Sequence, residues 1–146
     1  SGGGYVVDTG AYHFWFFGSA VSRRPIDYLE GLTAVFCLED NGAFWYGKLV
    51  HFHIDNQAFQ ASATKGWSHA DRLNELLRLM LFLTVKYNCI VLYHWISTHG
   101  NVLADPLSRD DEQAFLERAT SSTSPLHGPP QRHADAGTRR GGPTFI

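Results

Sequence analysis

Residues 49–56 read LVHFHIDN and carry the clearest structural pattern in this chain. Residues 49–54 alternate in side-chain type and include β-branched and aromatic residues, a pattern typical of a β-strand. Asp55 follows the strand directly, and residues 56–65 predict a short helix that ends at Gly66. A strand that runs through a carboxylate into a helix indicates an α/β domain.

Predicted strands and helices also alternate on both sides of this stretch. The predicted strands are residues 5–7, 12–21, 49–54 and 89–96, the last being an apolar run of the buried type. The predicted helices are residues 25–41, 56–65, 68–88 and 102–116, with Pro25 in the first turn of the first and Ser68 as the cap of the third. This order predicts an α/β fold with a partly parallel sheet.

Composition divides the chain near residue 119. Residues 120–146 contain four of the six prolines, many small polar residues and few large apolar ones. Such a segment cannot offset its ordering entropy by burial, so we expect a flexible tail there. Residues 1–119 form the predicted domain, because 44% apolar and 14% aromatic residues in the whole chain indicate a packed core.

Charge and cysteine usage exclude several classes of protein. The net charge of −2 argues against a module that grips phosphates by positive charge alone. No apolar run reaches the roughly 18 residues of a membrane span. Cys37 and Cys89 are isolated and predict reduced core thiols rather than a zinc site. The chain starts without Met and without a signal-peptide pattern, so we expect an intracellular piece of a longer polypeptide.

Four acids occupy positions where functional groups gather in α/β proteins. Asp8 and Asp55 follow predicted strands, Glu30 lies beside the apolar face of the first helix, and Asp105 follows the loop after the last strand. Carboxylates brought together repel one another unless a cation neutralises them, and hard oxygen ligands suit Mg²⁺ or Mn²⁺. Taken singly, each Asp is equally a turn former or helix cap, and Glu30 equally a solvated helix acid.

Each of the four acids lies in a short sequence motif of its own. The longest, NVLADPLSR at residues 101–109, resembles the Asn-x-x-Ala-Asp-x-Leu-Ser-Arg signature of the ribonuclease H domain of retrotransposon polyproteins. VDTGA at 7–11, IDYLEGLTAV at 26–35 and HIDNQA at 53–58 resemble the family's other acid-bearing segments. The resemblance implies a ribonuclease H-like mixed sheet flanked by helices. Its N-terminal β region is shortened, since the interval between Asp8 and Glu30 holds one good strand.

The resemblance also implies a function. It predicts a two-metal endonuclease, using Mg²⁺ or Mn²⁺, that hydrolyses the RNA strand of RNA–DNA hybrids during reverse transcription. Asp8 bridges both ions in this scheme, Glu30 and Asp55 hold one side and place the attacking water, and Asp105 completes the other side. The implied partners are the hybrid and an upstream reverse transcriptase domain.

Two alternatives stay open. The first is a catalytically inactive ribonuclease H-like module that connects polyprotein domains or binds nucleic acid passively. The second is another two-metal nuclease or a DNA strand transferase of the same fold. Metal binding and cleavage of a hybrid separate the first alternative from an active enzyme, and a comparison of substrates separates the second.

Further residues have two interpretations each. His99, six residues before Asp105, corresponds to a loop histidine that aids product release or proton transfer in some family members, or is a solvated loop residue. The predicted nucleic-acid contacts are Asn56, Gln57, Lys65, Trp67 and Arg72. Asn56 is equally a helix cap and Trp67 equally an anchor between helices. His51 and His53 share a strand face, but no cysteine or suitably spaced histidine near them completes a zinc motif.

Overall fold

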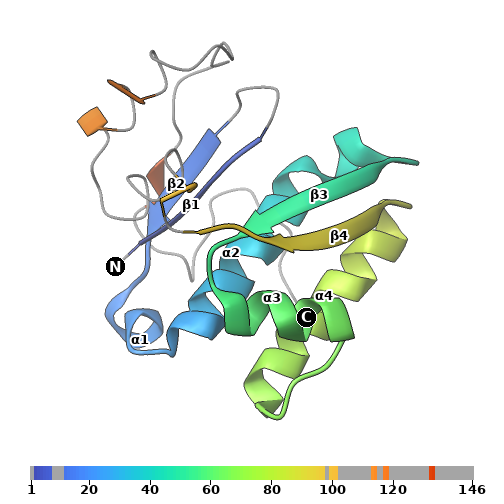
Figure 1. Ribbon diagram of the computed structural model, residues 1–146, viewed down its shortest axis with the longest axis horizontal. Helices are drawn as coiled ribbons and strands as arrows, with labels where there is room; N and C mark the ends of the chain where they lie inside the picture. The colour runs from blue at the N-terminus through green and yellow to red at the C-terminus, as the bar shows by residue number, and fades with distance from the viewer. Residues whose placement is uncertain are drawn as a thin grey trace. The chain divides into compact units, whose positions relative to one another are not determined.

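Strands and helices alternate along the described part of the chain, as the sequence predicts, and form a mixed α/β structure (Figure 1). The computed structural model describes residues 2–7, 12–97, 99–101, 113–114, 117–118 and 132–133. The chain divides into two compact units, residues 1–24 with 102–146 and residues 25–101. Asp8, Asp105 and most of the predicted last helix and tail lie outside the described residues.

The first unit contains a small sheet. Strand β1 (Gly2–Val6) pairs antiparallel with β2 (Tyr12–Phe16), and β2 pairs parallel with the two-residue strand β5 (Arg132–His133). The predicted strand over residues 12–21 is too long, because helix α1 (Ser19–Ser22) follows Gly18. The Ser22 hydroxyl donates to the Phe17 carbonyl at 2.8 Å, which stabilises this change of direction.

The second unit carries most of the described residues. Its elements are α2 (Ile26–Asn41), the 3₁₀ helix η1 (Gly42–Trp45), β3 (Leu49–Ile54), α3 (Gln57–Lys65), α4 (Asp71–Lys86) and β4 (Ile90–Trp95). Strands β3 and β4 pair in parallel, from Leu49 opposite Ile90 to Ile54 opposite Trp95. The parallel direction requires the long crossover through α3 and α4, which Figure 1 shows next to the strand pair.

Local chemistry explains the ends of α3. The Asn56 side chain accepts a hydrogen bond from the Phe59 amide at 2.8 Å, which satisfies an otherwise free N–H of the first turn. Gly66 ends the helix in the left-handed region with φ 78°, a conformation that costs glycine little. Strand β3 therefore has the predicted bounds, and α3 ends as predicted but begins at Gln57, one residue later than predicted.

The start of α4 differs from the prediction. Ala70, not Ser68, is the capping residue, and the helix begins at Asp71. Ser68 acts in the preceding turn instead, because its hydroxyl accepts from the Ala70 amide at 3.2 Å. Its backbone exchanges two hydrogen bonds of 2.7 Å with the Asn74 side chain. These bonds hold the turn that leads into the helix.

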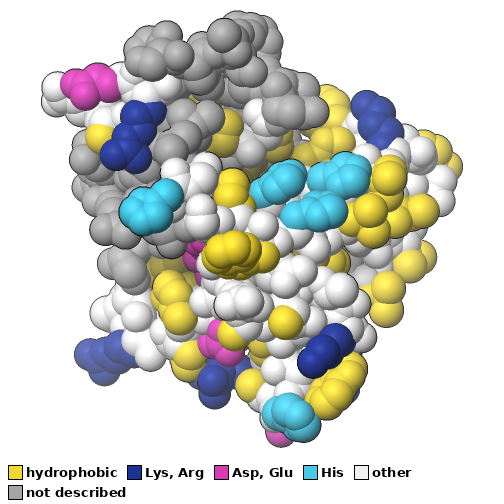
Figure 2. All heavy atoms as spheres, viewed as in Figure 1, with side chains coloured by type: hydrophobic (Ala, Val, Ile, Leu, Met, Phe, Trp, Pro, Cys, Tyr) yellow, Lys and Arg dark blue, Asp and Glu magenta, His cyan; other side chains and the backbone are white. Residues whose placement is uncertain are grey.

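Burial of β4 also differs from the prediction. The sequence predicts a strand buried on both faces, but Ile90 is 64% exposed and Leu92 41% exposed. In β3, Phe52 and Ile54 are buried in the core whereas His51 and His53 are exposed, so one face of the pair packs and the other is open. Figure 2 shows histidine side chains gathered beside hydrophobic ones on the surface. The packing of helices on one face, rather than the strand's own composition, determines this difference.

The two cysteines are buried and form no disulfide, as predicted. Burial raises the pKa of both the Cys37 and the Cys89 thiol, so both stay protonated and unreactive at neutral pH. None of the helices among the described residues has the length and apolar character needed to cross a membrane.

Candidate metal centre

Glu30 and Asp55 come together in the second unit. Glu30 lies on α2 between the buried residues Leu29 and Gly31, and Asp55 follows the carboxyl end of β3. Their side chains are joined by a hydrogen bond. Burial first, and then the charge of Asp55, raise the pKa of Glu30 from 4.5 to about 7. At neutral pH this acid pair therefore holds a proton for a substantial part of the time.

Asp55 is fixed by groups from β4 and from the segment after it. The Trp95 indole N–H donates to the Asp55 backbone carbonyl at 3.2 Å. The Asn101 side-chain amide donates to Oδ2 of Asp55 at 3.0 Å. Asn101 stands at the head of the 101–109 motif, a signal for a role at this site that was not among the predicted ones. These bonds orient both the backbone and the carboxylate of Asp55.

The chemistry of the pair fits one side of a divalent-metal site. Two half-buried carboxyl groups in contact are stabilised by a proton here, and a cation would also neutralise their charge. Their oxygens are the ligands that Mg²⁺ and Mn²⁺ prefer. Within the described ranges no group of three Asp, Glu, His or Cys side chains is placed to hold a metal ion. The other two predicted ligands, Asp8 and Asp105, are not among the described residues.

The predicted nucleic-acid contacts lie in and around α3. Asn56 caps α3, as one of its two interpretations stated. Gln57, Lys65, Trp67 and Arg72 are all exposed, and Trp67 packs edge-on against His69 with ring centroids 4.7 Å apart. His99 is exposed in the loop after β4. Exposure leaves these side chains accessible to a nucleic acid.

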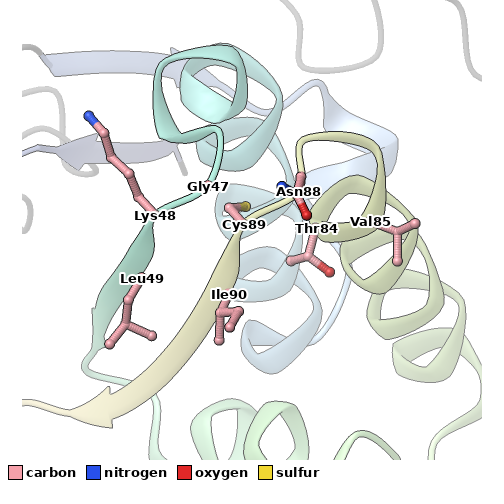
Figure 3. Close-up of a pocket in the computed structure, with 8 residues that line it drawn as sticks. All are labelled: Gly47, Lys48, Leu49, Thr84, Val85, Asn88, Cys89 and Ile90. Carbon is pink, nitrogen blue, oxygen red and sulfur yellow. The ribbon is translucent and has the colours of Figure 1, made fainter.

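A surface groove lies at the opposite end of the β3–β4 pair (Figure 3). It has a volume of about 520 Å³ and is lined by Lys48, Leu49, Val85, Asn88 and Ile90, among others. The groove adjoins the amino ends of both strands, whereas Asp55 follows the carboxyl end of β3, about 20 Å away along a strand of this length. Lys48 and Cys89 are the ionisable side chains of its lining, and Cys89 is buried and protonated.

Comparisons with known proteins add no relative: no protein-family model, curated protein or solved structure matches the chain.

The raised pKa of Glu30 predicts how stability depends on pH without metal. The folded protein holds this proton up to about pH 7, while the unfolded chain loses it near 4.5. The contribution of Glu30 to stability is thus complete below pH 4.5 and is lost as the pH rises through 7. We expect Glu30→Gln to raise the free energy of unfolding at pH 8 in EDTA by about 1–3 kcal/mol.

Urea unfolding at pH 5 and pH 8 measures this difference, which should be much smaller at pH 5. Glu75→Gln on the exposed side of α4 is the matched control and should change stability by less than about 0.5 kcal/mol at either pH. A Glu30→Gln protein no more stable than wild type at pH 8 would contradict the proposed environment of Glu30.

Proposed function

We propose that this chain is a divalent-metal-dependent ribonuclease that hydrolyses the RNA strand of RNA–DNA hybrids, on a ribonuclease H-like fold within a retroelement polyprotein. One observation carries the proposal. Glu30 and Asp55, which lie on different elements and belong to different motifs of the resemblance, are in hydrogen-bonding contact. An alternating α/β order with a parallel strand pair is compatible with the proposed fold.

The residues of the pair have distinct proposed roles. Asp55 presents a carboxylate whose orientation is set by Asn101 and Trp95. Glu30 adds a second carboxylate from α2, and releases its proton readily near neutral pH because its pKa is about 7. The resemblance assigns Asp8 and Asp105, which lie outside the described residues, to the same ligand set. Mg²⁺ held there would lower the pKa of a bound water and neutralise charge on the phosphodiester.

Binding of the hybrid is proposed to involve the connection between α3 and α4. Lys65 and Arg72 lie two and five residues from Trp67 in the sequence, and Trp67 offers an exposed aromatic face for stacking. The rest of the chain adds little positive charge. The tail has three arginines and one aspartate, so residues 1–119 carry 9 basic and 13 acidic side chains. We therefore assign much of the affinity to bound metal and to an upstream reverse transcriptase domain.

The inactive-module alternative is favoured by one bond. Asn101 donates to Oδ2 of Asp55, as it would if this carboxylate had a purely structural role. In that case the chain would fold and connect neighbouring domains without catalysis.

A panel of substrates decides between these functions. The full chain is incubated in millimolar Mg²⁺ with labelled RNA–DNA hybrid, duplex DNA, duplex RNA and single-stranded RNA. We expect cleavage of the RNA in the hybrid alone, and loss of that cleavage in EDTA. A folded protein that cleaves none of the four would support the inactive module, and cleavage of duplex DNA would support a different two-metal enzyme.

A further inference from the structure

Three histidines gather on the exposed face of the β3–β4 pair. His53 lies directly opposite His94 in the parallel register, and His51 lies two residues before His53 on the same face of β3. All three side chains are exposed, whereas Phe52 and Ile54, which alternate with them, are buried. The cluster is therefore built by strand pairing and is accessible from solvent.

The imidazole rings are close enough to act together. Nδ1 of His51 lies 2.8 Å from Nε2 of His94, and the two rings stack with centroids 5.0 Å apart and planes at 22°. The His53 ring stacks on the His94 ring at 5.3 Å and 25°. His94 thus has an imidazole partner on each side, and one of its nitrogens directly faces a nitrogen of His51.

We propose that His51 and His94 bind one borderline transition-metal cation, such as Cu²⁺ or Zn²⁺, on this face. Imidazole nitrogen suits these ions, whereas Mg²⁺ prefers oxygen. Metal–nitrogen bonds of about 2.0–2.1 Å place two neighbouring ligand nitrogens about 3 Å apart around one ion. The 2.8 Å separation of the His51 and His94 nitrogens is close to this spacing. Small rotations of the two rings would let a cation bind both nitrogens, and the proton between them would be released to solvent.

Two imidazoles supply the protein ligands of this site, and water supplies the others. This count agrees with the described part of the chain, where no three metal-ligating side chains are placed around one ion. His53 acts as a positioning residue, because its ring packs against the His94 ring. The site is chemically separate from the Glu30–Asp55 pair, which offers only oxygen ligands, and it does not depend on the proposed nuclease function.

Electron paramagnetic resonance of the full chain with one equivalent of Cu²⁺ tests this proposal, since nitrogen hyperfine splitting reports bound imidazole. Excess Mg²⁺ is present to occupy oxygen sites. We expect nitrogen splitting from two imidazoles in the wild type. In His51→Ala and in His94→Ala we expect loss of one nitrogen and an affinity at least about tenfold weaker, measured by competition with a chelator.

His69→Ala is the matched control, because His69 is an exposed histidine of the same unit outside the cluster. It should bind Cu²⁺ as the wild type does, and so should Asp55→Asn, which separates this site from the acid pair. Circular dichroism checks that each variant is folded; the three histidines are exposed, and asparagine keeps the size of the half-buried Asp55. Unchanged Cu²⁺ affinity in His94→Ala, or a wild-type spectrum with oxygen ligands only, would overturn the proposal.

Discussion

Asp55→Asn is expected to lower the rate of hybrid cleavage at least about a hundredfold, equivalent to about 2.7 kcal/mol of transition-state stabilisation. The substitution removes the negative charge that a divalent cation needs from this ligand. It keeps an oxygen that accepts the Asn101 hydrogen bond, and the Trp95 bond to the backbone carbonyl is unaffected. The fold should therefore survive while the activity is lost.

Single-turnover cleavage of a labelled hybrid measures the rate, and urea unfolding measures the stability of the same preparations. Glu75→Gln on the exposed face of α4 is the matched control for the loss of one acid and should retain wild-type cleavage. If Asp55→Asn keeps more than a tenth of the wild-type rate, Asp55 is not a metal ligand of the reaction and the proposed centre is wrong.

Gly42→Ala is expected to destabilise the second unit by about 2–4 kcal/mol, at or above the usual range for overpacking. A Cβ at this position would lie 2.0 Å from Cδ2 of the Tyr87 ring, with two more ring atoms at 2.4 and 2.5 Å. The backbone of Gly42 is helical, with φ −54° and ψ −36°, so alanine itself is not strained there. The penalty comes from the ring that follows α4.

A double-mutant cycle isolates this contact. Urea unfolding is measured for the wild type, Gly42→Ala, Tyr87→Ala and the double variant. In the Tyr87→Ala background the Gly42→Ala substitution should cost nothing, and should stabilise by up to about 1 kcal/mol because alanine favours helical backbone. A penalty that persists without the Tyr87 ring would show that the backbone, not the contact, requires glycine at this position.

Short-range chemistry explains where the sequence predicts structure well. Strand β3 has its predicted bounds because its residues alternate in side-chain type, and α3 ends where Gly66 adopts a positive φ. The larger differences between the predicted and the observed strands concern packing. The exposed face of β4 and the end of β2 at Phe16 depend on which elements lie against each strand, and no window of a few residues contains that information.

The features of the candidate site also divide into those that follow from the sequence and those that depend on tertiary packing. The residue types and their order follow from the sequence alone: acids after strands and on the first helix, and an asparagine at the head of the longest motif. Only the tertiary structure placed Glu30 against Asp55, brought Asn101 to Asp55 and set His94 beside His51. It also decided that Gly42, which directly follows the first helix, faces Tyr87. Backbone propensity acts over neighbouring residues, whereas desolvation, pKa and steric contact depend on groups that packing brings together from distant parts of the chain.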